Sequence, residues 1–212
     1  MKKERFGFSK EEYDILKKLN SPSKIQDFIN NLKINFEENG DSCMSPRMVL
    51  KTKKAHCVEG AIMAAAALRI NGYPPLIVDL EANKSDYDHV ICVFKINSFW
   101  GAITKTNHAI LRYREPVYRT IRELVMSYFH EYTNLNGKKT LRSYSNPVNL
   151  KIFDKYNWMA SEEEVWFIPD YLTQIKHYPI LNKKQIRSLR KADLIEIKAG
   201  NLMEYKGPNK LI

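Results

Sequence analysis

Apolar residues recur at helical spacing along the first fifty residues of the chain. Tyr13, Leu16 and Leu19 follow Ser9 and Glu12, whose spacing is that of a capping box. Two further helices are predicted from positions 21 and 45, where Ser-Pro pairs stand, because proline suits the first helical turn. The polar segment 35–45 between them predicts a loop.

The next hundred residues change from a helical to a strand pattern. The segment 57–70 is alanine-rich and apolar nearly all round, which predicts a buried helix. Asn71 and Gly72, followed by two prolines, end this helix. Three strand-like runs follow at 76–80, 89–96 and 99–105, and the last two flank Asn97 and Ser98 as a hairpin would.

The remaining pattern predicts a helix over 120–132, a polar loop over 134–147 and a strand over 149–153. Residues 161–164 cap a further helix or turn, and 183–197 read as a basic amphipathic helix. No repeat or long linker interrupts the chain, so we expect one α+β domain over 1–212. It comprises N-terminal helices (1–50), a core (51–107) and a helical or mixed extension (108–212).

Composition narrows the class of protein. The chain has 212 residues, of which 44% are hydrophobic, and its longest apolar run (61–68) is shorter than the roughly 20 residues that span a membrane. The first nine residues lack the apolar region of a secretory signal. Three cysteines give an odd count without a C-x-x-C pair. We therefore expect a cytosolic protein that needs no membrane, disulfide, metal or cofactor.

The net charge of +10 leaves nucleic acid open as a partner. The basic residues are scattered, however, and no block of five occurs. The densest basic and aromatic stretch, 112–122, contains four arginines and two tyrosines. This stretch could bind a carboxylate, a phosphate or a nucleic-acid strand, or it could form a surface with internal ion pairs.

Cys57 stands where the alanine-rich helix begins. Unpaired N–H groups and the helix dipole stabilise a thiolate at such a position. His89 heads a strand and can act as the base of this thiol. Across the hairpin we expect Asn107 to orient the imidazole, as in Cys-His-Asn hydrolases, with Thr104 and Thr106 as alternatives.

Other residues have simpler interpretations. His108 would replace His89 if the strand register differed. His56 is interpreted as a capping or surface residue, and Glu59 as a carboxylate that favours the first helical turn. Cys92 fits the apolar core and Cys43 a polar loop.

Two segments resemble the core of the transglutaminase-like superfamily: Lys-Ala-His-Cys-Val-Glu-Gly-Ala at 54–61 and Leu-Arg-Ile-Asn-Gly-Tyr-Pro-Pro at 68–75. In that family a cysteine with an acidic residue two positions on opens the central helix, and a histidine heads the next strand, as His89 does here. The family's aspartate does not follow the segment Trp100-Gly101-Ala102-Ile103. The resemblance covers residues 50–107.

The resemblance implies a papain-like α+β fold, with a cysteine-headed helix on an antiparallel sheet. It also implies acyl transfer from a peptide or protein substrate through a thioester on Cys57. Water or an amine would accept the acyl group, and the Cys57 N–H would bind the oxyanion.

A second hypothesis is a non-catalytic binding module of the same fold, whose basic surface docks an acidic or nucleic-acid partner. The residue that faces His89 discriminates between the two. A threonine there, without a nearby asparagine or aspartate, favours the binding module.

Overall fold

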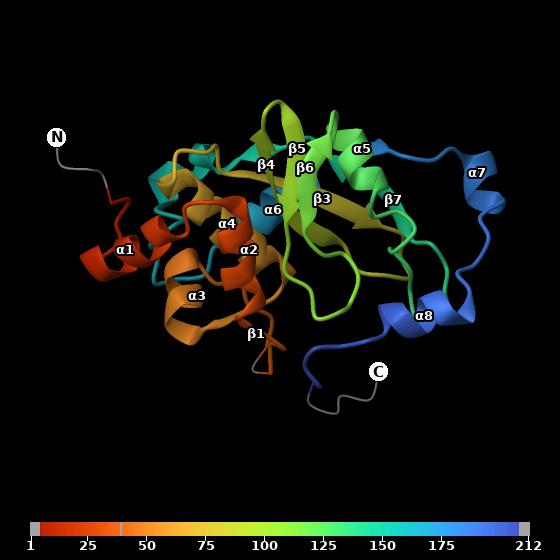
Figure 1. The fold of residues 1–212 in the computed structure, drawn as a ribbon, viewed down its shortest axis with the longest axis horizontal. Helices are drawn as coiled ribbons and strands as arrows, with labels where there is room; N and C mark the ends of the chain where they lie inside the picture. The colour runs from red at the N-terminus through yellow and green to blue at the C-terminus, as the bar shows by residue number, and fades with distance from the viewer. Residues whose placement is uncertain (1–4, 39, 208–212) are drawn as a thin grey trace.

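An antiparallel sheet forms the centre of the molecule (Figure 1). The computed structural model describes residues 5–38 and 40–207. Within them six strands lie in the order β6-β5-β4-β3-β7-β9, and β8 also pairs with β3. The strands are β3 (Leu76–Ala82), β4 (His89–Ile96), β5 (Phe99–Ile103), β6 (Arg114–Tyr118), β7 (Leu141–Ser145), β8 (Val148–Asn149) and β9 (His177–Pro179).

Helix α4 (Cys57–Ile70) packs on one face of this sheet, mainly against β4. From Glu59 to Ile70 every residue except Arg69 is buried. The helices α1 (Lys10–Lys18), α2 (Pro22–Asn30) and α3 (Pro46–Thr52) surround α4. An apolar helix therefore lies between the sheet and three other helices, which confirms the predicted buried helix and the α+β class.

The three N-terminal helices begin at the predicted caps. Ser9 and Glu12 form a capping box, and Ser21 and Ser45 accept N–H bonds from the first turns of α2 and α3. Such caps satisfy amides that have no acceptor within the helix.

The opposite face of the sheet is covered by α5 (Ile121–Met126) and the turns that follow it. Tyr128, Phe129 and Tyr132 continue this cover. They pack with Val78 and Leu80 of β3 in one hydrophobic cluster on this face of the sheet. The helix predicted over 120–132 is thus real but shorter, because it changes to turns after Met126.

Several predictions for the C-terminal half are wrong. The supposed loop 134–147 contains β7, whose residues alternate between buried and half-buried. Instead of a strand over 149–153, β8 runs into the 3-10 helix η1 (Leu150–Tyr156), because the Asn149 side chain caps the N–H of Lys151. Of the two alternatives for 161–164 the helix is wrong, because α6 (Phe167–Gln174) begins later; the Ser161 hydroxyl instead accepts the Glu163 N–H in a bend of the chain.

The predicted helix over 183–197 is two helices, α7 (Lys183–Arg187) and α8 (Leu194–Gly200). Asn182 and Asp193 each form a capping box, so the second box starts a new helix inside the predicted one. The sequence analysis also missed β6, β9 and the short parallel pair β1 (Lys33–Ile34) and β2 (Lys54–Ala55).

In the described part of the chain, no helix has both the length and the apolar composition to cross a membrane. Nor does any group of three His, Cys, Asp or Glu side chains there have the arrangement of a metal site.

Gly60 allows α4 to approach the end of β5. A Cβ atom at this position would overlap the Cβ of Lys105. The Lys105 ammonium is buried and donates to the carbonyl oxygens of Asn30 and Leu32, so this side chain has little freedom to move aside. The glycine therefore fixes the distance between the first turn of α4 and the segment that follows β5.

We predict that Gly60→Ala destabilises the protein by roughly 1–3 kcal/mol, the usual cost of overpacking. Helix propensity alone would favour alanine by about 1 kcal/mol. Denaturant unfolding of the variant and the wild type measures the difference in their free energies of unfolding. Gly200→Ala is the matched control, because its Cβ would lie at an ordinary 3.4 Å from Ile110. Equal stability of Gly60→Ala and the wild type would contradict the close-packing argument.

Candidate active site

Cys57 is the first residue of α4 and is half-buried. Its N–H lies in the first helical turn, where an amide has no acceptor within the helix. The positive end of the helix dipole also lies here and favours an anion. The sequence prediction that places this cysteine at a helix N-terminus is confirmed.

The three thiols differ in their ionisation. Burial raises the pKa of Cys57, but hydrogen bonds and the charges of His56 and His89 outweigh it and lower this pKa to about 5. Burial raises the pKa of Cys43 and of Cys92, each above the ordinary thiol value. Within the described chain, Cys57 is therefore the thiol that ionises at neutral pH.

His89 is the first residue of β4 and is buried. The structure brings it close enough to Cys57 for its imidazole to lower the pKa of the thiol. On its other side the His89 Nε2 lies 2.7 Å from the Thr104 Oγ1. His89 thus neighbours both the Cys57 thiol and the Thr104 hydroxyl.

A side chain from α2 places Thr104. The Gln26 Nε2 donates to the Thr104 carbonyl oxygen at 2.9 Å, and the Thr104 N–H donates to the Gln26 Oε1 at 3.0 Å. This pair of bonds replaces a strand ladder at the end of β5, where the chain leaves the sheet after Ile103. Gln26 is buried and was not among the predicted site residues.

The structure does not place Asn107 beside His89, which corrects the predicted orienting residue. The Asn107 amide bonds instead to the backbone N–H and carbonyl of Tyr205, both at 2.9 Å. Continuing the β4–β5 register from Cys92↔Ile103 would have brought Thr106 opposite His89. The early end of β5 brings Thr104 there, which was one of the two alternatives.

The other candidates lie away from the thiol. The Thr106 hydroxyl accepts the N–H of His108 at 3.0 Å, and the His108 Nδ1 lies 2.9 Å from the Gly200 carbonyl oxygen. His108 therefore ties the chain to α8 and does not replace His89.

Glu59 does more than favour the first turn of its helix. Its carboxylate is fully buried and accepts bonds from the backbone N–H groups of Met44 and His56, both at 2.9 Å. It also accepts bonds from the side chains of Asn35 and Ser42. This carboxylate thus holds the loop 35–44 against the start of α4.

His56 is the N-cap residue of α4, as predicted, and it directly precedes Cys57, whose thiol raises its pKa. Its Nδ1 accepts the Val58 N–H at 3.3 Å, and its Nε2 lies 2.9 Å from the Ser42 carbonyl oxygen. The carboxylates of Glu59 and Glu37 lie 3.5 Å and 3.7 Å from the same Nε2.

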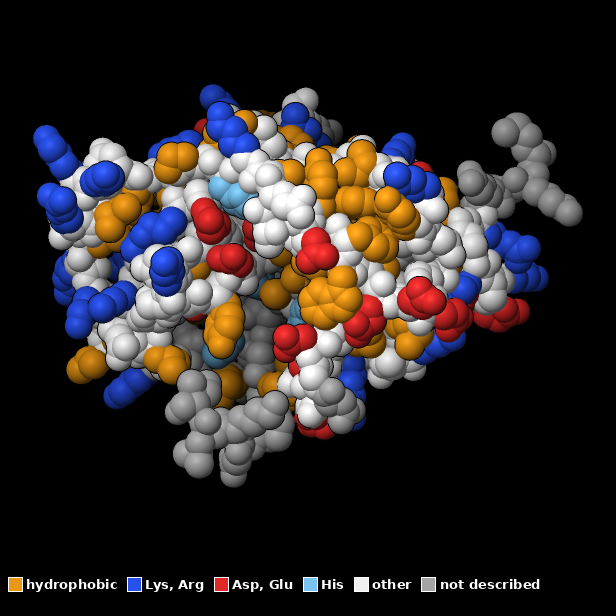
Figure 2. Space-filling view, turned by 180° about the vertical axis from the view of Figure 1, so that it is seen from behind, with side chains coloured by type: hydrophobic (Ala, Val, Ile, Leu, Met, Phe, Trp, Pro, Cys, Tyr) orange, Lys and Arg blue, Asp and Glu red, His pale blue; other side chains and the backbone are white. Residues whose placement is uncertain are grey.

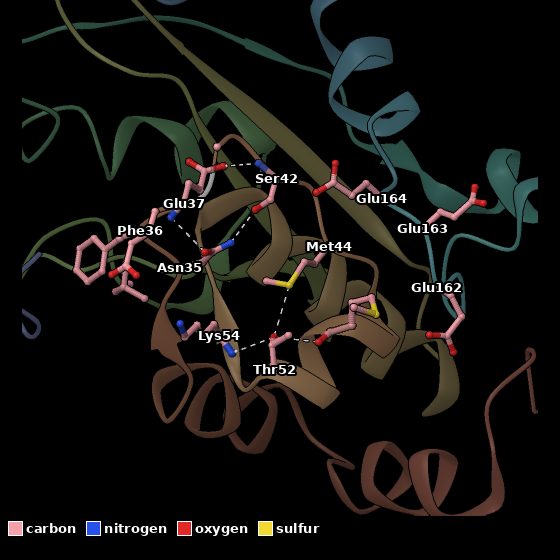
Figure 3. Close-up of a pocket in the computed structure, with 14 residues that line it drawn as sticks. Asn35, Phe36, Glu37, Ser42, Met44, Thr52, Lys54, Glu162, Glu163 and Glu164 are labelled. Carbon is pink, nitrogen blue, oxygen red and sulfur yellow. Dashed lines mark hydrogen bonds between the residues drawn. The ribbon is translucent and has the colours of Figure 1, made fainter. Parts of the chain in front are cut away.

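A pocket of about 340 Å³ adjoins this loop (Figure 3). Ser42 and Glu37, which both contact His56, belong to its wall. Five of the lining residues are glutamates, at 37, 38 and 162–164, against the one lysine Lys54. The pocket therefore suits a neutral or cationic group better than an anionic one.

Figure 2 shows one face of the molecule, with acidic side chains near its centre. This face is hollowed near its centre, with Asp and Glu side chains on both sides of the hollow and Lys and Arg side chains mostly toward the edges of the face.

The basic stretch 112–122 is partly engaged in internal contacts. Arg114 bonds Glu131 at 2.7 Å and lies over the Tyr128 ring, and Arg112 lies 3.5 Å from Glu204.

We predict that Thr104→Val raises the midpoint of Cys57 alkylation against pH by about one unit. Valine has the shape of threonine but no hydroxyl to hold His89. The rate of reaction with iodoacetamide, with the modified cysteine mapped by mass spectrometry, measures the midpoint. Thr104→Ser is the control and should keep the wild-type profile. A wild-type profile for Thr104→Val would show that the hydroxyl does not position the imidazole.

No protein-family model matches this chain, and a search of curated proteins finds no significant match. The interpretation of the site therefore depends on its geometry and chemistry.

Proposed function

We propose that this protein is a thiol-dependent hydrolase or acyltransferase of transglutaminase-like, papain-like fold, acting on peptide or amide bonds. The observation that carries the proposal is the position of the Cys57 thiol at the N-terminus of α4, next to the N-cap His56 and near His89; this environment also lowers the pKa of the thiol. A structural cysteine needs no such environment, whereas a nucleophile must be a thiolate.

In the acylation step the Cys57 thiolate attacks the carbonyl carbon of the substrate. The N–H of Cys57, free of any intrahelical bond, would donate to the oxygen as negative charge develops on it. The carbon–nitrogen bond then breaks as the carbon–sulfur bond of the thioester remains. Protonated His89 gives its proton to the departing nitrogen, which leaves as an amine.

In the deacylation step neutral His89 takes a proton from the acceptor, which is water or an amine. The acceptor attacks the thioester carbonyl, and the carbon–sulfur bond breaks to restore the thiolate. The Thr104 hydroxyl suits both steps, because it can donate to or accept from the His89 Nε2. It holds the ring while the proton on the opposite nitrogen moves.

Cys57→Ala should abolish turnover of peptide or amide substrates and leave the fold intact. A mixture of short peptides and amides, quenched in acid, is assayed for products and for an acyl adduct by intact-protein mass spectrometry. We expect an adduct on Cys57 of the wild type, and a loss of at least about a thousandfold in rate for the variant. Cys92→Ala is the control, since Cys92 is a fully buried core thiol of β4 whose pKa is raised by burial alone. Retained turnover in Cys57→Ala would contradict the proposal.

One observation favours the binding module as a second candidate. Thr104, and neither an asparagine nor an aspartate, faces His89. A hydroxyl lacks the charge with which an aspartate stabilises an imidazolium. The glutamates around the pocket would repel a nucleic acid from this face, so such a partner would have to bind elsewhere on the +10 chain.

The second candidate predicts a mobility shift with random DNA or RNA at low salt. Its affinity should fall steeply as salt rises, because phosphate contacts release counter-ions. The shift should be the same for the wild type and Cys57→Ala. Absence of any shift at low salt would exclude nucleic acid as the partner.

A further inference from the structure

His56 is held in one orientation by groups on both of its ring nitrogens. The Nε2 faces the Ser42 carbonyl oxygen at 2.9 Å, with two carboxylates behind it. All three of these groups can only accept hydrogen bonds, so the Nε2 carries a proton. The Nδ1 faces the first turn of α4, where it accepts the Val58 N–H, and Cys57 is the next residue along the chain.

The Nδ1 atom has a different role in each protonation state of the ring. In the neutral ring it accepts the Val58 N–H at 3.3 Å and caps the helix. In the imidazolium the Nδ1 is a donor, so it releases the Val58 N–H and can pair with an anion beside it; the thiolate of the adjacent Cys57 is such an anion. The protonated form of His56 is therefore the form that pairs with a thiolate.

The environment of the ring favours this protonated form. Burial lowers the pKa of His56, but its hydrogen bond with Cys57 and the charge of Glu59 outweigh burial and raise this pKa to about 9. The charged or titratable groups that face the ring are Glu37 from the loop, and Glu59 and Cys57 from α4. His89 approaches the same sulfur from β4.

The two imidazoles beside Cys57 differ in their outer partners. His89 has the neutral hydroxyl of Thr104, whereas His56 has two carboxylates and a carbonyl oxygen. An anion stabilises an imidazolium and a hydroxyl does so only weakly. The acidic support that the His89 side lacks is thus present on the other side of the sulfur.

We propose that His56 is a further catalytic residue, whose imidazolium is the permanent counter-ion of the Cys57 thiolate. This inference rests on the proposed function. His56 keeps its proton through the whole cycle, while His89 alone gives a proton to the leaving amine and takes one from the acceptor. Since the proton count of His56 does not change, the bonds made and broken at Cys57 remain those of the two steps above.

The test compares His56→Asn with the wild type. Asparagine is among the best N-cap residues, so the variant keeps the helix cap and removes the cation. The measured quantity is the midpoint of Cys57 alkylation by iodoacetamide against pH. We expect this midpoint to rise by about two units, so that alkylation below both midpoints slows roughly a hundredfold. His108→Asn is the matched control, because His108 bonds a backbone carbonyl away from the thiol.

The outcomes separate the inference from the function on which it rests. A low midpoint that His56→Asn leaves unchanged, and that His89→Ala raises, would overturn the role of His56 and leave the proposed function standing. A wild-type midpoint near the ordinary thiol value of about 8.5 would overturn both. A loss of thermal stability in His56→Asn without any change in the midpoint would mean that His56 is only a cap, which also overturns the inference.

Discussion

The geometry of the site depends on the buried carboxylate of Glu59. A charge that is removed from water is tolerated only where it is paired and hydrogen-bonded. Glu59 meets this condition through donors from Asn35, Ser42, Met44 and His56, all of which lie outside α4. The loop 35–44 must therefore close over the first turn of the helix. Its closure brings the Ser42 carbonyl oxygen to His56 and fixes that ring beside the sulfur.

The other side of the sulfur is fixed by contacts between helices and the sheet. Gly60 lets α4 approach the end of β5, and Gln26 from α2 holds the backbone of Thr104 at that end. Thr104 then holds His89, which β4 presents at its first residue. The nucleophile thus lies between a ring supported by carboxylates and a ring supported by a hydroxyl. This asymmetry is the basis of the proposal that one histidine holds charge and the other moves a proton.

The parts of the molecule that local chemistry determines could be predicted from the sequence. Ser9, Ser21 and Ser45 start helices because their side chains bond to amides within the next turn. The helix that begins at Cys57 and the strand that begins at His89 could likewise be predicted from local features: the alanine-rich segment 57–70 and the strand-like run 89–96. The partner of His89 could not be predicted, because it depends on Gln26, which is separated from Thr104 by 78 positions.

In the C-terminal half, too, contacts between residues distant in the sequence limited how much of the fold could be predicted. β7 and β9 are short, and they become strands because β3 offers its edge to β7, which in turn pairs with β9. The helical pattern over 183–197 did not reveal that Asp193 starts a second helix with its own capping box. Long-range pairing and competing caps, rather than weak hydrophobic patterning, account for these errors.

The central claim is that Cys57 is a thiolate at neutral pH, and the ultraviolet absorbance of the thiolate tests it most directly. The titration is recorded for the wild type and for Cys57→Ala, and the difference isolates this sulfur. A pKa lowered to about 5 means that the thiolate forms as the pH rises through about 5 and persists above it. A difference signal that develops only near the ordinary thiol value of about 8.5 would contradict the account.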